Sequence, residues 1–511
     1  MLISIQNILG SQLSAISGQR LEIELPLSKS ESNRALMIMY YAGIQNLKIL
    51  ATQQLSNLVS LSNSDDTVLL QKHLNTLNQY IQNLLSEVRR PLTLELDCHN
   101  AGTVFRFLMT AVANQCIMHN SQFIIDDDLS LKQLSNSVTQ QLSVLLTGSE
   151  RMKSRPVSSL VDALRSLGVS IEYTEKEGYP PVLIVSTDRE DLHGFLSSGD
   201  TRDTRDTRRE CLNVSTDHKD LHGLLLSGNT SDTRDMRRLE ISAEQSSQFA
   251  SSLLLAAPLW KNGLELHLTG NLSSLPYIDM TINMMRQCGV DVERNERDII
   301  VKPGIYNVEN VKVEPDWSAA AFWYEMVSLS DDAEILLKNL NINSLQADAA
   351  AIKIFENLGV ETIATKDGVV VKKVNSQQSM ANSQWLAVNF KDCPDSFPAV
   401  IAACAGNRVN ATFTGLKNLS IKESDRKQAM MNELMKINIT FEDVSDDELK
   451  MFCPEVLPYF TEESPIIFNN YEDHRIAMAL SVLTMKIGAI SMENVDVVSK
   501  SYPDFFTTTS L

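Results

Sequence analysis

The chain has 511 residues, of which 43% are hydrophobic and 21% charged, a composition typical of a folded globular protein. This length exceeds one ordinary hydrophobic core, so we expect two domains of unequal size. The net charge of −19 disfavours nucleic acid and anionic membranes as partners, and no apolar run approaches the roughly 20 residues that cross a bilayer.

Targeting and metal-binding patterns are both weak in this sequence. Residues 1–10 show neither a basic stretch nor a cleavage pattern, so we expect a cytoplasmic protein. Seven scattered cysteines without a C-x-x-C pair favour neither a disulfide framework nor a zinc site. His218 and His222 have the spacing of a metal-binding pair, but no third ligand lies nearby. We therefore expect no metal.

The first predicted helix begins with a cationic motif. Residues 25–34, Leu-Pro-Leu-Ser-Lys-Ser-Glu-Ser-Asn-Arg, place proline and serine before the helix, where they suit its free N–H groups. Lys29, Ser30 and Arg34 then lie at the positive end of the helix, which attracts anions. An ordinary capped helix with exposed charges explains this motif equally well when it is taken alone.

Three further motifs in the first half also precede predicted helices. Residues 100–103, Asn-Ala-Gly-Thr, are followed by Arg106 one turn into a helix, and the glycine lets an anion approach the backbone closely. Residues 151–156, Arg-Met-Lys-Ser-Arg-Pro, gather three cations before a helix, and residues 246–248, Ser-Ser-Gln, precede an apolar one. Each is common by itself, because caps and charge runs occur in most proteins.

One structural unit recurs along the chain: a helix that ends at glycine or asparagine, followed by a β-type run. The units span residues 161–173, 280–294, 349–371 and 427–441. The helix stops have a clear backbone reason, and an Asp-Gly turn in the third unit predicts a hairpin. This repetition predicts an α/β fold of duplicated modules, without the glycine-rich fingerprint of a dinucleotide-binding sheet.

A tandem duplication occupies residues at about 185–240. Val-Ser-Thr-Asp at 185–188 recurs at 214–217, and the same offset relates Asp-Leu-His-Gly at 191–194 to 220–223. We favour a duplication tolerated in a surface loop, because added loop length costs little free energy. The alternative is a regulatory or partner-binding arm.

The second half of the chain contains four charged motifs. Asp395 lies in residues 392–398, before a helix of small residues. Residues 422–427, Lys-Glu-Ser-Asp-Arg-Lys, and residues 472–475, Glu-Asp-His-Arg, each begin a helix, whereas residues 500–503 close the last predicted strand region. Repeated anion-binding helix starts, far apart in sequence, are typical of a site for several anions between two domains.

The motifs SKSESNRAL, NAGT, RMKSRP, SSQF, SLPYID, KESDR, EDHRIAM and KSYPDFF occur in this order over nearly the whole chain. The series resembles that of the 5-enolpyruvylshikimate-3-phosphate (EPSP) synthase family. The resemblance implies the two-domain α/β enolpyruvyl transferase fold, each domain having three repeated units of helices and mixed sheet around a pseudo-threefold axis. It implies a first domain of residues 28–314 carrying the insert, which we expect to protrude, and a discontinuous second domain of residues 1–27 and 315–511.

The implied reaction transfers the enolpyruvyl group of phosphoenolpyruvate to the 5-hydroxyl of shikimate 3-phosphate and releases phosphate, a step of aromatic amino acid biosynthesis. The resemblance makes Asp395 the candidate acceptor of the hydroxyl proton. Lys29 and Glu423 are the candidates for protonating the methylene and for handling the departing phosphate. It implies no metal or organic cofactor, and we expect a monomer whose partners are the two small-molecule substrates.

The resemblance also assigns binding residues, position by position. The shikimate 3-phosphate site consists of Lys29, Ser30, Arg34, Ser246, Ser247, Gln248, Ser274, Tyr277, Asp395, Asn418 and Lys422. The phosphoenolpyruvate site consists of Lys29, Gly102, Arg151, Gln248, Arg426, Arg475 and Lys500. Guanidinium groups suit both substrates, because they bind carboxylate and phosphate through paired hydrogen bonds. Gly102 leaves the second pocket unfilled by a methyl group, which implies inhibition by glyphosate.

The sequence departs from the family pattern at a few positions. Leu27 and Pro315 stand where glycine is common, Ser420 where a basic residue is frequent, and Glu472 where a small polar residue is usual. These departures bear on affinity rather than on identity.

Two other functions are weighed against this one. A UDP-N-acetylglucosamine enolpyruvyl transferase shares the fold, but it has a Lys-Asn pair near the N-terminus and a loop cysteine. This sequence has Lys29-Ser30 and no comparable cysteine. A non-catalytic binding protein on the same fold would have lost charged motif residues, which are present here.

Overall fold

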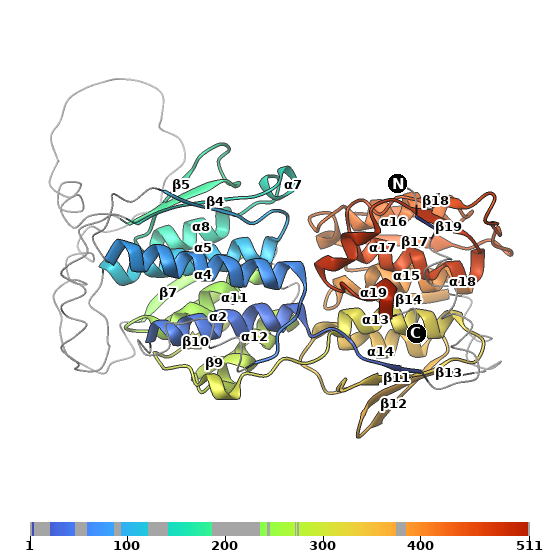
Figure 1. Cartoon of the computed structure of the whole chain (residues 1–511), viewed down its shortest axis with the longest axis horizontal. Helices are drawn as coiled ribbons and strands as arrows, with labels where there is room; N and C mark the ends of the chain where they lie inside the picture. The colour runs from blue at the N-terminus through green and yellow to red at the C-terminus, as the bar shows by residue number, and fades with distance from the viewer. Residues whose placement is uncertain are drawn as a thin grey trace.

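The computed structural model describes residues 3–4, 21–45, 59–85, 93–120, 142–186, 236–242, 246–270, 272, 275–374 and 385–508. They form two lobes that lie side by side (Figure 1). The buried hydrophobic side chains make two separate clusters. One extends from residue 35 to residue 311, and the other combines Ile23 and Leu25 with residues 317–506. We call these parts of the chain the first lobe and the second lobe.

The described part of the first lobe contains two mixed four-stranded sheets. One has the spatial order β3 (Leu94–Asp97), β4 (Ser143–Thr147), β6 (Val182–Val185) and β5 (Ser170–Tyr173). The other has the order β7 (Arg237–Ser242), β8 (Leu264–Thr269), β10 (Asp298–Val301) and β9 (Val292–Arg294). In both, the first two strands are parallel and the remaining pairs antiparallel.

The second lobe repeats this arrangement. One sheet consists of β2 (Leu21–Ile23), β11 (Glu334–Lys338), β13 (Gly368–Lys373) and β12 (Val360–Thr365). Another consists of β14 (Trp385–Asn389), β15 (Asn410–Thr414), β17 (Glu448–Phe452) and β16 (Thr440–Ser445). Both again pair their first two strands in parallel. A three-stranded sheet joins β1 (Ile3–Ser4), β19 (Ile490–Met492) and β18 (Ile466–Phe468). The α/β fold of repeated modules is confirmed.

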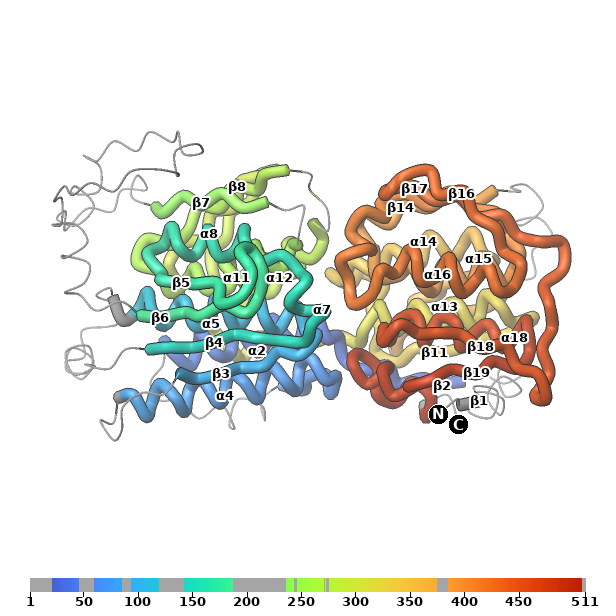
Figure 2. The backbone as a smooth tube through the Cα atoms, turned by 90° about the horizontal axis from the view of Figure 1, so that it is seen from above, coloured from blue at the N-terminus to red at the C-terminus, as the bar shows by residue number. Residues whose placement is uncertain are grey.

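Each lobe also contains helices. Those of the first lobe are α2 (Lys29–Gln45), α4 (Asp65–Leu85), α5 (Gly102–Asn120), α7 (Glu150–Lys153), α8 (Ser158–Ser166), α11 (Ser247–Ala256) and α12 (Leu275–Gln287). Those of the second lobe are α13 (Trp317–Leu329), α14 (Ala351–Glu356), α15 (Phe397–Asn407), α16 (Arg426–Met435), α17 (His474–Val482), α18 (Thr484–Ile487) and α19 (Phe505–Thr508). Figure 2 shows α5 and α11 between the strands β3 and β4 on one side and β7 and β8 on the other. None of the helices within the described ranges is long and apolar enough to span a membrane.

The predicted helix stops are confirmed by the backbone. The residues that follow α8, α12, α14 and α16 take left-handed conformations at Gly168, Gly289, Gly359 and Asn438, with φ between 66° and 88°. Glycine and asparagine adopt this conformation at little cost, so each helix ends there and the next strand begins. Two of the units also contain the same kind of hydrogen bond. The Arg165 guanidinium donates to the Ile171 carbonyl, and the Arg286 guanidinium donates to the Val292 carbonyl.

One predicted element is wrong. The segment that ends at Lys500 is not a strand region but a 3₁₀ helix, Val495–Lys500. The reason is local, because β19 ends at Met492 and Asn494 turns the chain with a φ of 46°. The duplicated insert falls between β6 and β7, and residues 187–235 of it lie outside the described residues.

The chain crosses between the lobes twice, and the two crossings lie against each other. Leu27 and Pro315 form an antiparallel bridge, and the amide of Ser28 donates to the carbonyl of Glu314 at 2.8 Å. Beside them, the buried Glu31 carboxyl accepts a hydrogen bond from the Glu314 amide at 2.7 Å. A carboxyl of α2 thus connects the start of the first lobe to the second crossing.

Glu31 is expected to make stability depend on pH. Burial raises the pKa of Glu31 to about 8, with Glu314 and Asp316 adding to the shift, while the Glu314 amide and Arg34 oppose it. In the unfolded chain the pKa is ordinary, so the folded protein retains a proton that the unfolded chain releases between pH 4.5 and 8. The stability from this group is therefore complete below pH 4.5 and is lost as the pH rises towards 8.

The variant Glu31→Gln keeps an acceptor for the Glu314 amide but cannot ionise. Its free energy of unfolding, relative to that of the parent, should rise by up to about 1.4 kcal/mol per pH unit across this window. Urea unfolding of both proteins at pH 5, 6, 7 and 8 measures the difference. A difference that stays constant with pH would contradict the assigned cause.

Candidate active site

A cavity between the lobes is lined by residues of both. Its walls consist of Lys29, Ser30, Arg34, Asp66, Gly102, Thr103, Arg106, Arg155, Ser246, Ser247, Gln248, Tyr277, Asp395, Asn418, Ile421, Lys422, Glu423, Arg426 and Arg475. The predicted site residues are among them, except Arg151, Lys500 and Ser274. Ser274 lies outside the described residues. The structure adds Asp66, Thr103, Arg106, Arg155 and Ile421.

Seven of the described helices begin at this cavity. The first residues of α2, α4, α5, α11 and α12 come from the first lobe, and those of α16 and α17 from the second. Two of these helix starts are capped by side chains: Ser246 accepts from the Gln248 amide, and Asp473 from the Arg475 amide. Because the N-terminal end of a helix carries a partial positive charge, the seven ends together favour a bound anion.

The side chains of the cavity reinforce this preference. Seven of the lining residues are cationic and three carry carboxylates, although the whole chain has a net charge of −19. The cationic residues are Lys29, Arg34, Arg106, Arg155, Lys422, Arg426 and Arg475. Cationic residues are therefore concentrated at this cavity, as the binding of anionic substrates requires.

Two of these cations, Arg106 and Arg155, have buried donor atoms with unused hydrogen-bonding capacity. Both are buried, and the Nε atom of Arg106 and the Nε and Nη1 atoms of Arg155 have no acceptor among the described residues. Arg106 Nη1 donates to Gln248 Oε1 at 2.6 Å. Burial, and in Arg106 the neighbouring charge of Arg155, lowers the pKa of both guanidinium groups. An anion between them would supply both the missing acceptors and the missing charge.

Both arginines lie in or next to motifs that indicate anion binding in the sequence. Arg106 follows Asn-Ala-Gly-Thr by one turn, and Arg155 is the second arginine of Arg-Met-Lys-Ser-Arg-Pro. The resemblance led to Arg151 instead. The amide of Arg155 donates to the carbonyl of Met152 at 3.0 Å, and the turn after α7 directs the Arg155 side chain beneath Gly102.

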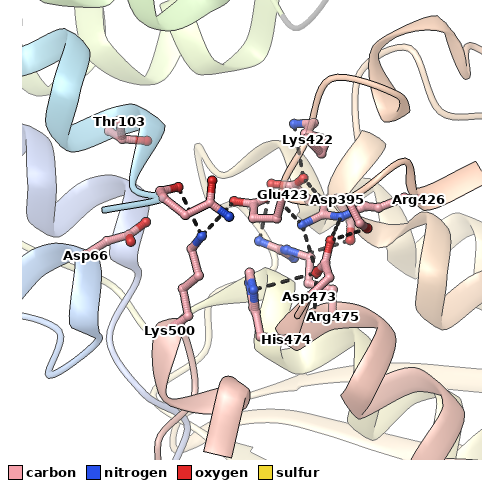
Figure 3. Close-up of polar contacts among 12 residues, drawn as sticks. Asp66, Thr103, Asp395, Lys422, Glu423, Arg426, Asp473, His474, Arg475 and Lys500 are labelled. Atoms are coloured by element: carbon pink, nitrogen blue, oxygen red, sulfur yellow. Dashed lines mark hydrogen bonds and ion pairs between the residues drawn. The ribbon is translucent and has the colours of Figure 1, made fainter. Parts of the chain in front are cut away.

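Asp395 lies at the centre of a cationic cluster (Figure 3). Its carboxylate is 2.8 Å from Arg426 Nη1, 3.2 Å from Lys422 Nζ and 3.2 Å from Arg475 Nη2. Burial acts to raise its pKa, but Arg475, Lys422 and Arg426 outweigh burial and hold the pKa well below its ordinary value. Tyr277, from the first lobe, places its hydroxyl 3.4 Å from the same carboxylate.

Glu423 and Arg426 extend this cluster. Arg426 Nη2 is 2.9 Å from Glu423 Oε2, and Arg426 Nε is 2.8 Å from the fully buried Asp473. Burial acts to raise the pKa of Glu423, but Lys500, Arg426 and Arg155 hold it well below its ordinary value. Both candidate proton-transfer carboxyls are therefore ionised in this arrangement.

Lys29 and Lys500 approach from the edge of the cluster. Lys29 Nζ lies 3.3 Å from Asp66 Oδ2, a contact between the first turns of α2 and α4. Lys500 Nζ lies 3.6 Å from Glu423 Oε1 and donates to the Asn100 carbonyl of the first lobe at 3.3 Å (Figure 3). Lys500 is thus adjacent to the cavity without forming its wall.

Arg151, which the resemblance assigns to the phosphoenolpyruvate site, contacts the second lobe in this structure. Its guanidinium points across to the second lobe and donates to the backbone carbonyls of Ser420, Lys422 and Glu423. It does not line the cavity among the described residues.

Comparison with solved structures identifies the class. The structure of an EPSP synthase from Acinetobacter baumannii matches with a TM-score of 0.58 at 18% sequence identity, covering 96% of this chain and 94% of that one. Together with the two lobes and the cationic cavity between them, this match defines an α/β protein of the two-domain enolpyruvyl transferase fold.

The sequence comparisons identify the family within that class. The family model described as EPSP synthase (3-phosphoshikimate 1-carboxyvinyltransferase) matches residues 13–198 and 226–509. A 3-phosphoshikimate 1-carboxyvinyltransferase from Bacteroides fragilis is 31% identical over 495 residues, covering 97% of this chain and 95% of the relative. One from Vibrio vulnificus is 27% identical over 499 residues, covering 95% and 94%. The chain belongs to the EPSP synthase family. The unmatched residues 199–225 fall within the duplicated insert.

Proposed function

We propose that this protein transfers the enolpyruvyl group of phosphoenolpyruvate to the 5-hydroxyl of shikimate 3-phosphate and releases phosphate. The observation that carries the proposal is the cavity between the lobes, where seven helix starts and seven cationic side chains converge in an acidic protein. The two substrates together bear two phosphates and two carboxylates. Hydrogen bonds and ion pairs from the cationic side chains offset the free energy that these anions lose when they leave water.

The two substrates divide the cavity in this proposal. Shikimate 3-phosphate binds Lys29, Ser30, Arg34, Ser246, Ser247, Gln248, Ser274, Tyr277, Asp395, Asn418 and Lys422. Phosphoenolpyruvate binds Lys29, Gly102, Arg151, Gln248, Arg426, Arg475 and Lys500, and we add Arg155 and Arg106. The support for this addition is that both arginines line the cavity beside Gly102 and have donor atoms without an acceptor among the described residues.

Asp395 removes the proton from the 5-hydroxyl. In the ligand-free site, Arg475, Lys422 and Arg426 lower the pKa of Asp395, so the carboxylate is a weak base. Binding of the substrate anions against these cations offsets part of their field, so the pKa of Asp395 rises towards that of an effective base when both substrates are present. Proton removal is thereby coupled to occupancy of the site.

The methylene carbon receives its proton from Lys29 or Glu423, and the same two residues assist the departing phosphate. Glu423 is ionised in the ligand-free site, so it must first gain a proton as anions offset Lys500, Arg426 and Arg155. Once the methylene carbon is protonated, the hydroxyl oxygen adds to the adjacent carbon, which bears the phosphate, and a tetrahedral intermediate results. Loss of phosphate from that adjacent carbon and of a proton from the new methyl group then restores the enol ether.

The test is phosphate release by the purified protein with phosphoenolpyruvate and shikimate 3-phosphate, and in parallel with UDP-N-acetylglucosamine as the acceptor. We expect release with shikimate 3-phosphate only. Release with the amino sugar only, or with neither acceptor from folded protein, would overturn the proposal.

Gly102→Ala is expected to weaken binding of phosphoenolpyruvate. A Cβ atom at this position would lie 2.5 Å from Arg155 Nη1 and 2.8 Å from Arg106 Nη1, so both guanidinium groups must shift. We expect the KM for phosphoenolpyruvate to rise by about tenfold, since a misplaced charge-assisted pair loses roughly 1.4 kcal/mol or more. Inhibition by glyphosate, which we propose for the parent, should weaken further. Unchanged KM values and inhibition would contradict this account.

We also propose domain boundaries and a cellular setting. The first domain comprises residues 28–314 and the second residues 1–27 and 315–511, supported by the two separate buried clusters. The protein acts in the cytoplasm, supported by the unpaired state of the six cysteines that the structure describes, which suits a reducing compartment. In this proposal it also acts as a monomer. Size-exclusion chromatography with light scattering tests the monomer.

A further inference from the structure

Arg34 is a buried cation that lies between helices of the first lobe. Its side chain extends from α2, is only 2% exposed and contacts Thr281 on α12 and Ser251 on α11. On another side, the ring centroid of Phe107, on α5, lies 6.0 Å from the guanidinium carbon. Burial lowers the pKa of Arg34 to about 10, so the guanidinium stays charged at neutral pH. Side chains from three other helices therefore surround a charged group.

Four hydrogen bonds hold the guanidinium. Arg34 Nε donates to Thr281 Oγ1 at 2.7 Å, and Nη2 donates to Ser251 Oγ at 3.4 Å. Nη2 also donates to the Tyr277 carbonyl at 3.0 Å, and Nη1 donates to the Ser30 carbonyl at 2.8 Å. All four acceptors are neutral, so they orient the guanidinium without cancelling its charge. A guanidinium has five N–H groups, and among the described residues these bonds leave one, on Nη1, for a ligand in the cavity that Arg34 lines.

The Thr281 hydroxyl is the centre of this arrangement. It is fully buried and accepts the Arg34 Nε–H. Its own proton has two acceptors within reach, Ser251 Oγ at 2.8 Å and the Tyr277 carbonyl at 2.9 Å. Because the guanidinium is planar and rigid, a bond to Nε fixes the directions of all its other N–H groups. Thr281 therefore decides which N–H of Arg34 is directed at the cavity.

We propose that Thr281 is a positioning residue, whose hydroxyl holds the Arg34 guanidinium in the orientation that binds an anionic group of shikimate 3-phosphate. Ser251 supports the same orientation through its longer bond to Nη2. A guanidinium that is already oriented binds without the free-energy cost of ordering it, so loss of the Thr281 hydroxyl weakens substrate binding. The inference rests on the proposed function, which assigns Arg34 to the shikimate 3-phosphate site.

Two substitutions at Thr281 test this role. Thr281→Val keeps the shape of the side chain and removes the hydroxyl, whereas Thr281→Ser keeps the hydroxyl. We expect Thr281→Val to raise the dissociation constant and the KM of shikimate 3-phosphate by about tenfold, the usual effect of one lost hydrogen bond to a charged group. The kcat at saturating substrate concentrations should stay close to that of the parent, because the lost interaction is uniform binding. Thr281→Ser should restore the affinity of the parent.

Thr484→Val is the matched control. Thr484 is also buried, and its hydroxyl donates to the Gly488 carbonyl at 2.7 Å, but it belongs to the second lobe. This variant should bind shikimate 3-phosphate as the parent does. Parent-like affinity in Thr281→Val would overturn the proposal, and so would a loss of affinity that Thr281→Ser does not restore. Should Thr281→Val fail to fold, Ser251→Ala takes its place, with an expected rise of about threefold in the dissociation constant, and an unchanged constant would overturn the proposal.

Crystal structures of the ligand-free variants provide a readout that does not need turnover. In Thr281→Val the Arg34 guanidinium should rotate away from its orientation in the parent, and in Thr281→Ser it should keep that orientation. An Arg34 side chain that stays in place in Thr281→Val would overturn the proposal. If the parent neither binds shikimate 3-phosphate nor releases phosphate with it, the proposed function fails, and the orientation of Arg34 in these variants still decides whether Thr281 positions it.

Discussion

Asp395→Asn is expected to lower kcat by about a hundredfold to ten-thousandfold, the range over which general base catalysis usually contributes. Asparagine keeps the shape of the side chain and can accept a hydrogen bond from Arg426, but it cannot take up the hydroxyl proton. Removal of the negative charge leaves Arg426, Arg475 and Lys422 with more uncompensated positive charge. Binding of phosphoenolpyruvate should therefore be retained or strengthened.

The measurement combines turnover, from phosphate release, with the dissociation constant of phosphoenolpyruvate, from calorimetry. The urea transition of the variant shows that it is folded. Turnover close to that of the parent would remove Asp395 from its role as the base. A loss of turnover with an equal loss of phosphoenolpyruvate affinity would assign it to binding instead.

Arg426→Met is expected to destabilise the protein by about 3–5 kcal/mol, the usual result when one partner of a buried ion pair is removed. Arg426 is only 1% exposed and bonds Asp395, Glu423 and Asp473, of which Asp473 is fully buried. Burial acts to lower the pKa of Arg426, but Asp473, Glu423 and Asp395 raise it above its ordinary value. Methionine fills the space but leaves three carboxylates without their common partner.

Urea unfolding at pH 7 measures this loss. Lys450→Met is a suitable control in the same lobe, since Lys450 pairs with Glu442 at 3.2 Å on the exposed surface. Such pairs contribute about 1 kcal/mol or less. If the two variants lose similar stability, the buried network does not have the importance that its geometry indicates.

Much of the fold was predictable because its signals are local. The stops at Gly168, Gly289, Gly359 and Asn438 mark helix ends through the left-handed conformation that these residues tolerate. The segment before Lys500 was not predictable in the same way, since its β-branched residues favour a strand and the turn at Asn494 decides otherwise.

The sequence by itself determined the α/β modules, the helix starts that carry the charged motifs and, through the order of those motifs, the family. Which cations face the cavity was decided only by the tertiary structure. Arg151 and Arg155 lie four residues apart in one motif, yet one bonds a loop 272 residues away in sequence and the other lies beneath Gly102. Backbone preferences depend on neighbouring residues, and therefore a sequence can contain them. The direction of a side chain between two lobes depends on which distant backbone packs opposite it, and only the folded chain brings that backbone there.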